Sequence, residues 1–383
     1  MSDGLWPVTH ILFWSILMKI LAMYLPQFHE TPYNNKWWGE GYTDWVAAKN
    51  ARNYMNKQKL PRVPLDNNYY DLSDPSGKTL DWQAKLAKKY GIDGFCIYHY
   101  WFAGQQFLDT PCKILLEHKE IDIEFSFCWD CGSWKRTWTA VPGNNEQEIL
   151  VEQVFGDEEM WTKHFNDLLP YFKDSRYIKK DNKPVFHIYN VSLIPCLEQM
   201  RAHWDNLAKE KGFDGIYLIA GNISKDYPEN CQYADALYNF EPNTTRIKGL
   251  GARNLYLLFV EFKTALAKRL TWFPGLYTTI NSKIIYKLMC SREDSYLDKP
   301  VYLGLYPNHD ETPRRGKKGV IYYGETPELF EKTLKTQLER ARAREHDFLY
   351  INAWNEWGET CYLEPDEENG CAYLESVKRG RMH

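Results

Sequence analysis

The sequence lacks the features of a membrane-spanning or secreted protein. Its first apolar run, residues 11–17, is shorter than the roughly 18 residues that span a bilayer, and Lys19 follows it. No Lys or Arg precedes that run and no Ala-x-Ala-like cleavage site follows it, so no signal peptide is predicted. We expect no transmembrane segment, and we leave peripheral association with a membrane open.

The sequence also lacks a basic excess and the common nucleotide-binding and esterase motifs. Lys and Arg number 47 against 51 Asp and Glu, a net charge of −4, which argues against a nucleic-acid partner. It contains no P-loop, no Gly-x-Gly-x-x-Gly and no Gly-x-Ser-x-Gly. The nine Cys form no regular framework, which favours a reducing compartment, and we expect the cytoplasm. Cys128 and Cys131 form one Cys-x-x-Cys pair without a second pair, so we predict neither a metal site nor a cofactor there.

Aromatic residues, by contrast, are in surplus. The chain of 383 residues holds 15 Trp, 27 Tyr and 18 Phe, or 16% of the total. Apolar residues make up 44%, which is ample for a large core and excludes a disordered chain. The location of the aromatic side chains along the chain therefore becomes informative.

Short apolar runs alternate with helical patterns along the chain. Several runs are apolar at consecutive positions, as in strands buried on both faces, and repeated β-helix-β order indicates a parallel sheet. We predict an α/β fold, a single (β/α)8 TIM-type barrel over residues 18–383, with residues 1–17 as an N-terminal extension that need not be native. An open doubly wound sheet is the main alternative. The predicted strands are 20–25, 92–98, 123–129, 184–189, 215–220, 234–240, 301–306 and 348–353.

Two long segments exceed a minimal barrel. Residues 26–73 follow the first predicted strand, and residues 241–298 follow the sixth. Insertions after strands lie at the C-terminal face of a barrel, where active sites are found. We therefore expect both insertions to border the functional site.

Aromatic and polar residues gather directly after the predicted strands. The strand ends of a parallel barrel converge on one mouth. Aromatic faces cover the C–H faces of a pyranose and polar groups bond its hydroxyls, so such a mouth suits sugars. For any single Trp the alternative is core packing or loop anchoring, which weakens when so many follow strand ends. The substrate-binding candidates are Tyr24, Gln27, His29, Trp38, Tyr98, His99, Trp101, Trp129, Trp134, Arg136, Asn222, Arg314, Trp354 and Asn355.

The candidate histidines and the candidate arginine pair each have an alternative interpretation. His29 and His99 lack an evident third ligand, so we predict no metal; they would bond sugar hydroxyls or carboxylates, or serve structural roles. Arg314 and Arg315 form a pair that suits phosphate or carboxylate, with a solvated turn as the alternative.

Glu356 and Glu359 are the sharpest chemical feature. They stand three residues apart just past the eighth predicted strand, and a helical turn there would place them on one face. Two carboxyl groups near one bond divide acid and base work when their environments separate their pKa values. In glycoside hydrolysis one protonates the departing oxygen and the other acts as base or nucleophile. We predict that these two residues are catalytic; a solvated acidic loop is the alternative.

Several motifs follow one another in a fixed order along the chain. They are Tyr24-Leu25-Pro26-Gln27-Phe28-His29, Trp37-Trp38-Gly39, Tyr90-Gly91-Ile92-Asp93-Gly94-Phe95, Tyr98-His99-Tyr100-Trp101-Phe102, Lys183-Pro184-Val185-Phe186, Thr312-Pro313-Arg314-Arg315 and Trp354-Asn355-Glu356-Trp357-x-Glu359. This ordered set resembles one known family, the WbsX-type glycosyltransferases, whose domain is related to glycoside hydrolase family 99. The resemblance covers roughly residues 18–379 and implies a (β/α)8 barrel and a role in bacterial surface polysaccharide, usually O-antigen or capsule.

The resemblance also implies catalytic roles. In family 99 endo-mannosidases the first glutamate of the last motif removes a proton from the sugar 2-hydroxyl, giving a 1,2-anhydro intermediate, and the second serves as general acid and then base. Carried over, these roles fall on Glu356 and Glu359. The sequence departs from the family where Asn-Glu-Asn is usual and Cys131-Gly132-Ser133 stands instead, and where Asp-Asn is replaced by Asp310-Glu311.

Three functions follow as hypotheses. The first is a cytoplasmic transferase or transglycosylase that assembles a surface polysaccharide from an oligosaccharide or activated-sugar substrate. The second is a retaining endo-glycosidase, which the carboxyl pair favours on chemistry alone. The third is a sugar-binding protein with impaired catalysis, to which the missing glutamate at Gly132 points.

Overall fold

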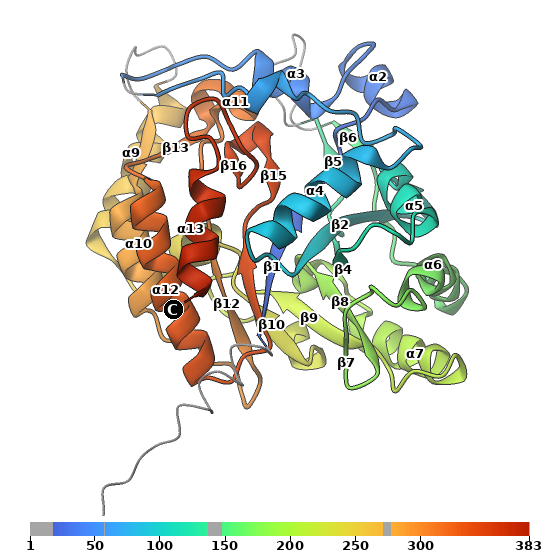
Figure 1. Cartoon of the computed structure of the whole chain (residues 1–383). Helices are drawn as coiled ribbons and strands as arrows, with labels where there is room; N and C mark the ends of the chain where they lie inside the picture. The colour runs from blue at the N-terminus through green and yellow to red at the C-terminus, as the bar shows by residue number, and fades with distance from the viewer. Residues whose placement is uncertain (1–17, 57, 137–147, 271–276, 383) are drawn as a thin grey trace, which may run out of the picture.

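The computed structural model describes residues 18–56, 58–136, 148–270 and 277–382. The expected extension, residues 1–17, lies outside the described residues. Eight parallel strands form a barrel, which closes because β1 pairs with both β2 and β14 (Figure 1). This closure confirms the predicted barrel and excludes the open sheet. The barrel strands are β1 (Lys19–Tyr24), β2 (Gly94–Phe102), β4 (Glu124–Trp129), β8 (Lys183–Ile188), β9 (Tyr217–Gly221), β10 (Ala236–Tyr238), β12 (Val301–Leu305) and β14 (Phe348–Ile351).

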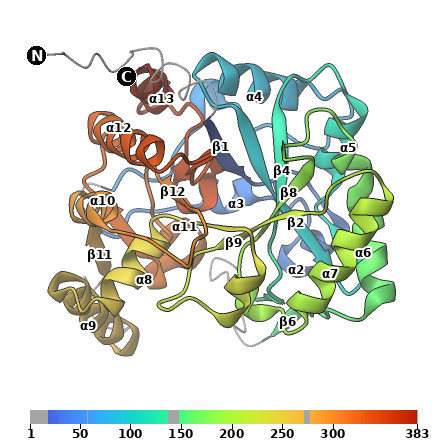
Figure 2. The ribbon, with the colours of Figure 1, turned by 90° about the horizontal axis from the view of Figure 1, so that it is seen from below.

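Helices surround the strands on the outside (Figure 2). Several have side-chain caps: Asp157 accepts a hydrogen bond from the Met160 amide at the start of α6, and Thr326 does the same for Leu329 in α12. Among the described residues, none of the helices combines the length and apolar character needed to cross a bilayer. The outer helices are α4 (Lys78–Lys89), α5 (Thr110–Glu117), α6 (Glu158–Phe172), α7 (Leu197–Glu210), α12 (Pro327–Ala343) and α13 (Ala372–Arg381).

All eight strands differ from their predicted bounds by at least one residue, and two of these differences have an evident local cause. β2 runs on to Phe102 because it turns through Ala103 and Gly104, both with positive φ, into an antiparallel hairpin with β3 (Gln105–Phe107). β10 is only three residues long, because Asn239 leaves the strand and its side chain joins a polar network described below.

The barrel interior is packed by aromatic residues whose polar ends are paired. The His187 ring bonds the Tyr350 hydroxyl at 2.7 Å and the Phe127 carbonyl oxygen at 3.0 Å. The Cys128 thiol lies 3.4 Å from the Tyr238 hydroxyl. A buried hydroxyl or ring nitrogen that found no partner would cost free energy, so these pairs make a dense aromatic core possible.

Both insertions lie at the end of the barrel where the parallel strands finish, as predicted (Figure 1). The first insertion contains α2 (Pro32–Trp38), α3 (Asp44–Lys49) and a 3-10 turn, Leu65–Asn67. The second contains α8 (Asn243–Gly251), α9 (Leu255–Arg269), β11 (Thr278–Asn281) and α10 (Ser282–Ser291). β11 pairs with β13 (Val320–Tyr323), which follows the short helix α11 (Thr312–Arg315), so the second insertion is tied to the loop after β12.

We expect Gly304→Ala to destabilise the barrel. A Cβ atom at Gly304 in β12 would overlap the backbone oxygen of Asn239, which cannot move without distorting β10. Overpacking of this kind costs about 1–3 kcal/mol, so thermal unfolding of the variant should occur at lower temperature. Gly132→Ala is the control, because its new Cβ would meet Leu193 Cδ1 at an ordinary 3.6 Å. Equal unfolding midpoints for the two variants would contradict the close approach at Gly304.

Candidate functional site

A cleft of about 430 Å³ opens at the mouth of the barrel. Its walls combine aromatic rings, side-chain amides and groups of both charges, and they come from both insertions and from the loops after β1, β2, β4, β8, β10, β12 and β14. The aromatic residues are Trp37, Trp38, Tyr98, Tyr100, Trp134, Tyr189 and Phe240; the amides are Gln27, Asn34, Asn243 and Asn352; the charged residues are Asp130, Lys135, Glu311, Arg314, Arg315, Glu356 and Glu359.

The Arg314 guanidinium gathers three carboxyl groups at this cleft. Its Nη2 atom lies 2.6 Å from Asp44 Oδ1 and 2.9 Å from Glu356 Oε1. Its Nη1 atom lies 3.2 Å from Glu356 Oε2 and 3.5 Å from Glu359 Oε1. Because Glu356 and Glu359 contact the same nitrogen, the structure brings the two predicted catalytic carboxyl groups together. Arg314 thus joins α11, α3 and the segment after β14.

Burial makes this cluster electrostatically unusual. Burial raises the pKa of Glu356 well above its ordinary value, against the opposing charge of Arg314, and Glu359 raises it further. Burial likewise raises the pKa of Asp44 in spite of Arg314. The Arg314 guanidinium keeps its proton, because the neighbouring carboxylates, led by Glu356, raise its pKa although burial acts the other way. The cluster therefore holds one permanent cation beside carboxyl groups that compete for a proton.

The local chain path explains why Glu356 and Glu359 meet. Glu356 ends β15 (Asn355–Glu356), and Glu359 ends the 3-10 turn Trp357–Glu359, so the expected helical turn is present in its tighter form. β15 pairs with β16 (Cys361–Tyr362), which fixes the turn. Trp357 stacks on Tyr362 with ring centroids 3.7 Å apart, and its indole N–H donates to Glu364 at 2.7 Å.

Seven of the predicted site residues line the cleft, and an eighth supports its wall. Gln27 donates to the Tyr100 hydroxyl at 2.7 Å, which orients both side chains. Arg136 lies behind the wall, where its guanidinium stands 5.2 Å from the Trp38 ring centroid and donates to the Trp37 carbonyl oxygen at 2.6 Å. The lining residues are Gln27, Trp38, Tyr98, Trp134, Arg314, Glu356 and Glu359.

The other candidates do not line the cleft. His99 bonds His164 of α6 at 2.8 Å between the ring Nε2 atoms, and Trp101 stacks on the same His164 ring. Their side chains thus pack between the barrel and its outer helices, because successive strand residues alternate between the two faces. The remaining candidates are also buried: Tyr24, His29, Trp129, Trp354 and Asn355. The Tyr24 hydroxyl donates to Gln83, and the Trp129 indole N–H donates to the Trp101 carbonyl oxygen. Asn355 bonds both backbone groups of Leu25, and burial lowers the pKa of His29.

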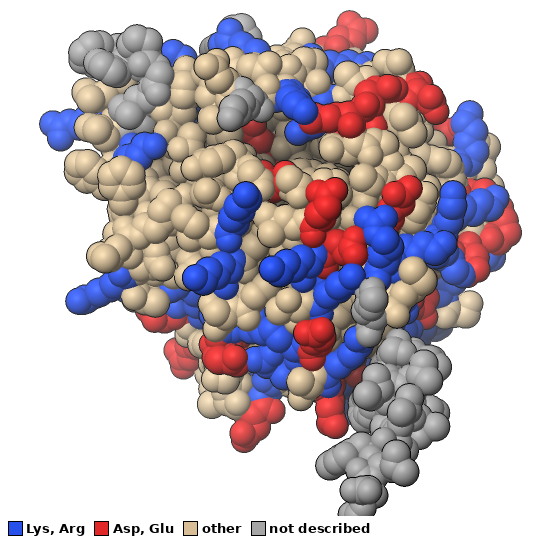
Figure 3. Space-filling view, turned by 60° about the vertical axis from the view of Figure 1, so that its left-hand side comes forward, with Lys and Arg blue, Asp and Glu red and all other residues tan. Residues whose placement is uncertain are grey.

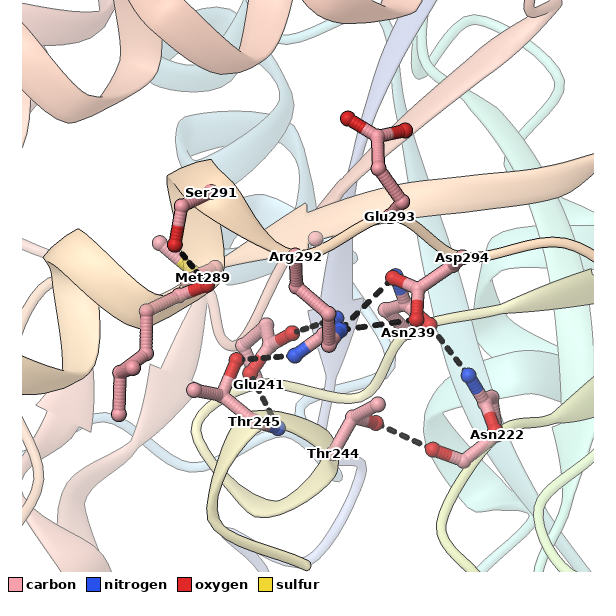
Figure 4. A network of polar contacts seen from close by, with 12 residues as sticks. Asn222, Asn239, Glu241, Thr244, Thr245, Met289, Ser291, Arg292, Glu293 and Asp294 are labelled. Carbon is pink, nitrogen blue, oxygen red and sulfur yellow. Dashed lines mark hydrogen bonds and ion pairs between the residues drawn. The ribbon is translucent and has the colours of Figure 1, made fainter. Parts of the chain in front are cut away.

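Asn222 belongs to a separate buried network (Figure 4). Its amide donates to the Asn239 side chain at 2.6 Å, and Asn239 donates to Asp294 at 2.8 Å. Arg292 joins Asp294 to Glu241 with contacts of 2.8 Å each. These pairs fasten the end of β10 to the far end of the second insertion, so Asn222 contributes to the support of the mouth.

Several lining residues were not among the sequence candidates. Asp130 follows β4 directly, and Tyr100 lies near the end of β2, so the strand-end criterion points to both. Burial raises the pKa of Asp130 to about 6. Asp44 carries no such signal, because it lies in a long insertion, far from any strand end in the sequence.

Comparisons with known proteins agree with this architecture. The sequence matches the model of the family "Glycosyltransferase WbsX" over residues 20–377. The chain belongs to this family. WxcX, an uncharacterized protein of Xanthomonas campestris pv. campestris, is 30% identical over 368 residues in each of two strains, covering 94% of this chain and 49% of WxcX. This WbsX-family chain thus spans about half the length of the curated relatives it matches.

Solved structures support the same fold. A GH99 endo-alpha-mannosidase from Bacteroides thetaiotaomicron superposes with a TM-score of 0.54 at 11% identity, covering 94% of this chain and 96% of that one. A structure described as a glycoside hydrolase-like protein gives a TM-score of 0.54 at 14% identity, covering 95% and 93%. At such low identity, the likeness establishes the barrel fold.

We expect Asp130→Asn to make the protein more stable at alkaline pH. The pKa of Asp130 in the folded protein lies above its ordinary value, so the folded state holds this proton more tightly than the unfolded state does. The resulting contribution to the free energy of unfolding is present near pH 4 and is lost as the pH rises through about 6. The variant should be more stable than the wild type by about 2 kcal/mol at pH 8 and similar to it at pH 4. Denaturant unfolding at both pH values measures this, with the exposed Asp214→Asn as control. A stability difference independent of pH would refute the prediction.

Proposed function

We propose that the protein is a glycosyltransferase of surface-polysaccharide biosynthesis that acts at glycosidic bonds with retention of configuration, using Glu356 and Glu359. The observation that carries this proposal is the pair itself: both carboxyl groups contact Arg314 Nη1 in a cleft with aromatic walls. Membership of the WbsX family supports transfer and the polysaccharide substrate class.

The cleft has the composition of a sugar-binding site. Trp37, Trp38 and Trp134 offer apolar ring faces for the C–H faces of a pyranose. Amides and carboxylates around them can bond the ring hydroxyls in both directions, as donors and as acceptors. At 430 Å³ the space suits an oligosaccharide of a few sugar units.

The proposed reaction has two proton transfers in each step. Glu356 accepts the proton of the sugar 2-hydroxyl, whose oxygen attacks the anomeric carbon, while Glu359 protonates the departing oxygen. An acceptor hydroxyl then gives its proton to Glu359 and attacks the anomeric carbon. This attack breaks the bond between that carbon and the 2-oxygen, which recovers its proton from Glu356. The raised pKa of Glu356 makes its carboxylate a stronger base, and Arg314 favours the ionised form that the first step needs.

At the cleft wall, Gly132 stands where the family pattern has a glutamate. We propose that the carboxyl group of Asp130 takes the place of the missing one. A Cβ atom at Gly132 would make only ordinary van der Waals contacts, with Leu193 Cδ1 at 3.6 Å and Asp130 Oδ1 at 3.8 Å. The cleft therefore lacks a side chain at that point but has the Asp130 carboxyl group beside it. We propose that Asp130 binds a sugar hydroxyl in this part of the cleft.

A retaining endo-glycosidase is the second candidate. The same two carboxyl groups would serve equally if water replaced the sugar hydroxyl as acceptor. The fold likeness to an endo-alpha-mannosidase is compatible with this chemistry.

We expect Glu356→Gln and Glu359→Gln each to lower turnover by at least about 100-fold, because a proton-transfer group is lost, while sugar binding is largely retained. Glu375→Gln, an exposed change on α13, is the matched control and should leave turnover unchanged. The assay incubates the protein with nucleotide-sugar donors and with mannose- and rhamnose-containing oligosaccharides, and mass spectrometry identifies the products.

The products separate the candidates. Elongated oligosaccharides support transfer, whereas cleavage to shorter products without elongation supports the glycosidase. Calorimetric binding of sugars without turnover of either class would assign the protein to sugar binding alone. Near wild-type turnover by either glutamine variant would refute the catalytic pair.

A further inference from the structure

Helix α9 (Leu255–Arg269) in the second insertion presents a row of large apolar side chains to solvent. Leu255, Phe262 and Phe259 are 83%, 66% and 59% exposed, and Leu258 and Leu266 are 41% and 37% exposed. Their spacing of three and four residues places them on one side of the helix. This side of α9 is called the apolar stripe below.

The opposite side of α9 is already covered by protein. Leu257, Val260 and Thr264 are buried against the rest of the second insertion, including α8 and β11. A helix that is apolar on both sides is normally buried on both. Contiguous exposed apolar surface on a folded protein marks a site of interaction, so the apolar stripe calls for a cover that the described chain does not provide.

The charges around the apolar stripe are positive. Arg253 precedes the helix and Arg269 ends it, both exposed, and Lys263 lies beside the stripe. The one acidic residue of α9, Glu261, is paired with Arg246 of α8 at 2.5 Å. The upper left-hand part of the surface in Figure 3 is mainly uncharged with Lys and Arg at its edge, whereas Asp and Glu gather elsewhere in the view. An occupant that complements this surface is apolar at its centre and negatively charged around it.

We propose that α9 docks on a bilayer that contains anionic lipids, with the apolar stripe among the acyl chains and Arg253, Lys263 and Arg269 at the headgroups. Helices that lie in a membrane interface combine such an apolar face with flanking cations. Anionic headgroups attract the cations, and the apolar side chains leave water on insertion.

A second copy of the chain fits this surface less well. A two-fold interface would bring identical surfaces together. With the two helices antiparallel, Arg253 of each copy would lie beside Arg269 of the other, and the stripe offers no acidic residue between them. Repulsion between these cations opposes that arrangement, whereas a surface of anionic lipid removes it.

Docking through α9 would place the barrel mouth beside the membrane. α9 follows α8 directly, and Asn243 at the start of α8 lines the cleft. Both helices belong to the insertion at the C-terminal end of the barrel (Figure 1). If the proposed function holds, the cleft would thus meet a glycan that is attached to a lipid; the docking itself does not depend on that function.

The test is flotation of the purified full chain with vesicles of phosphatidylcholine alone or mixed with phosphatidylglycerol. We expect the wild type to float with the mixed vesicles and much less with phosphatidylcholine, and added salt to reduce its binding. Phe259→Asp with Phe262→Asp should weaken binding roughly tenfold or more, because two charges replace inserted rings. Arg253→Gln with Arg269→Gln should weaken binding to mixed vesicles alone.

The matched control is Leu297→Asp, which changes an equally exposed apolar residue outside α9 and should bind like the wild type. All the changed side chains are exposed, so thermal unfolding midpoints should stay close to that of the wild type. Absence of wild-type binding to mixed vesicles overturns the proposal, as does undiminished binding of the double Asp variant. A wild-type dimer in sedimentation that the double Asp variant converts to monomer, without vesicle binding, assigns the stripe to a second copy instead.

Discussion

The Arg314 guanidinium is the one group on which the candidate site depends. It compensates the buried carboxyl groups of Asp44, from the first insertion, and of Glu356, from the segment after β14, together with the half-buried carboxyl group of Glu359. Removal of one partner from a buried ion pair leaves an uncompensated charge that costs about 3–5 kcal/mol, so the segments that carry these groups are held in one arrangement. The same charge that stabilises the arrangement opposes the burial that raises the pKa of Glu356. The contact between Arg314 and Glu356 thus determines both the arrangement of these segments and the pKa of the Glu356 carboxyl group.

The barrel supports this cluster by giving most polar aromatic groups a partner. Asn355 bonds both backbone groups of Leu25, which fixes β15 to the end of β1. The Trp357 indole and the Tyr70 hydroxyl both donate to Glu364, and burial raises the pKa of that carboxyl group to about 7. Asn355, a predicted sugar ligand, therefore lies behind the cleft, where its hydrogen bonds hold the adjacent Glu356 in position.

Much of the fold could be predicted because its strands are buried on both faces, and continuous apolar runs followed by turn residues mark them in the sequence. The Glu356–Glu359 pair could be predicted for a similar reason, since the eighth strand precedes it directly. The direction of individual side chains could not: His99 follows the same strand-end rule as Tyr98, yet it faces α6 while Tyr98 faces the cleft. Asp44 could not be predicted as a site residue, because only the folding of a long insertion brings its carboxyl group to Arg314.

The second insertion combines anchoring by ion pairs with an exposed apolar side on α9. Arg292 fastens its far end to Glu241 by buried ion pairs, so the segment is anchored at both ends of its path (Figure 4). Between those anchors, α8 contributes Asn243 to the cleft and α9 turns its apolar stripe outward. An exposed stripe of this kind favours aggregation unless something covers it, and a chain can carry it without loss only where a partner is regularly present. Because the anchors fix α9 relative to the cleft, whatever covers the stripe also sets the surroundings of the mouth.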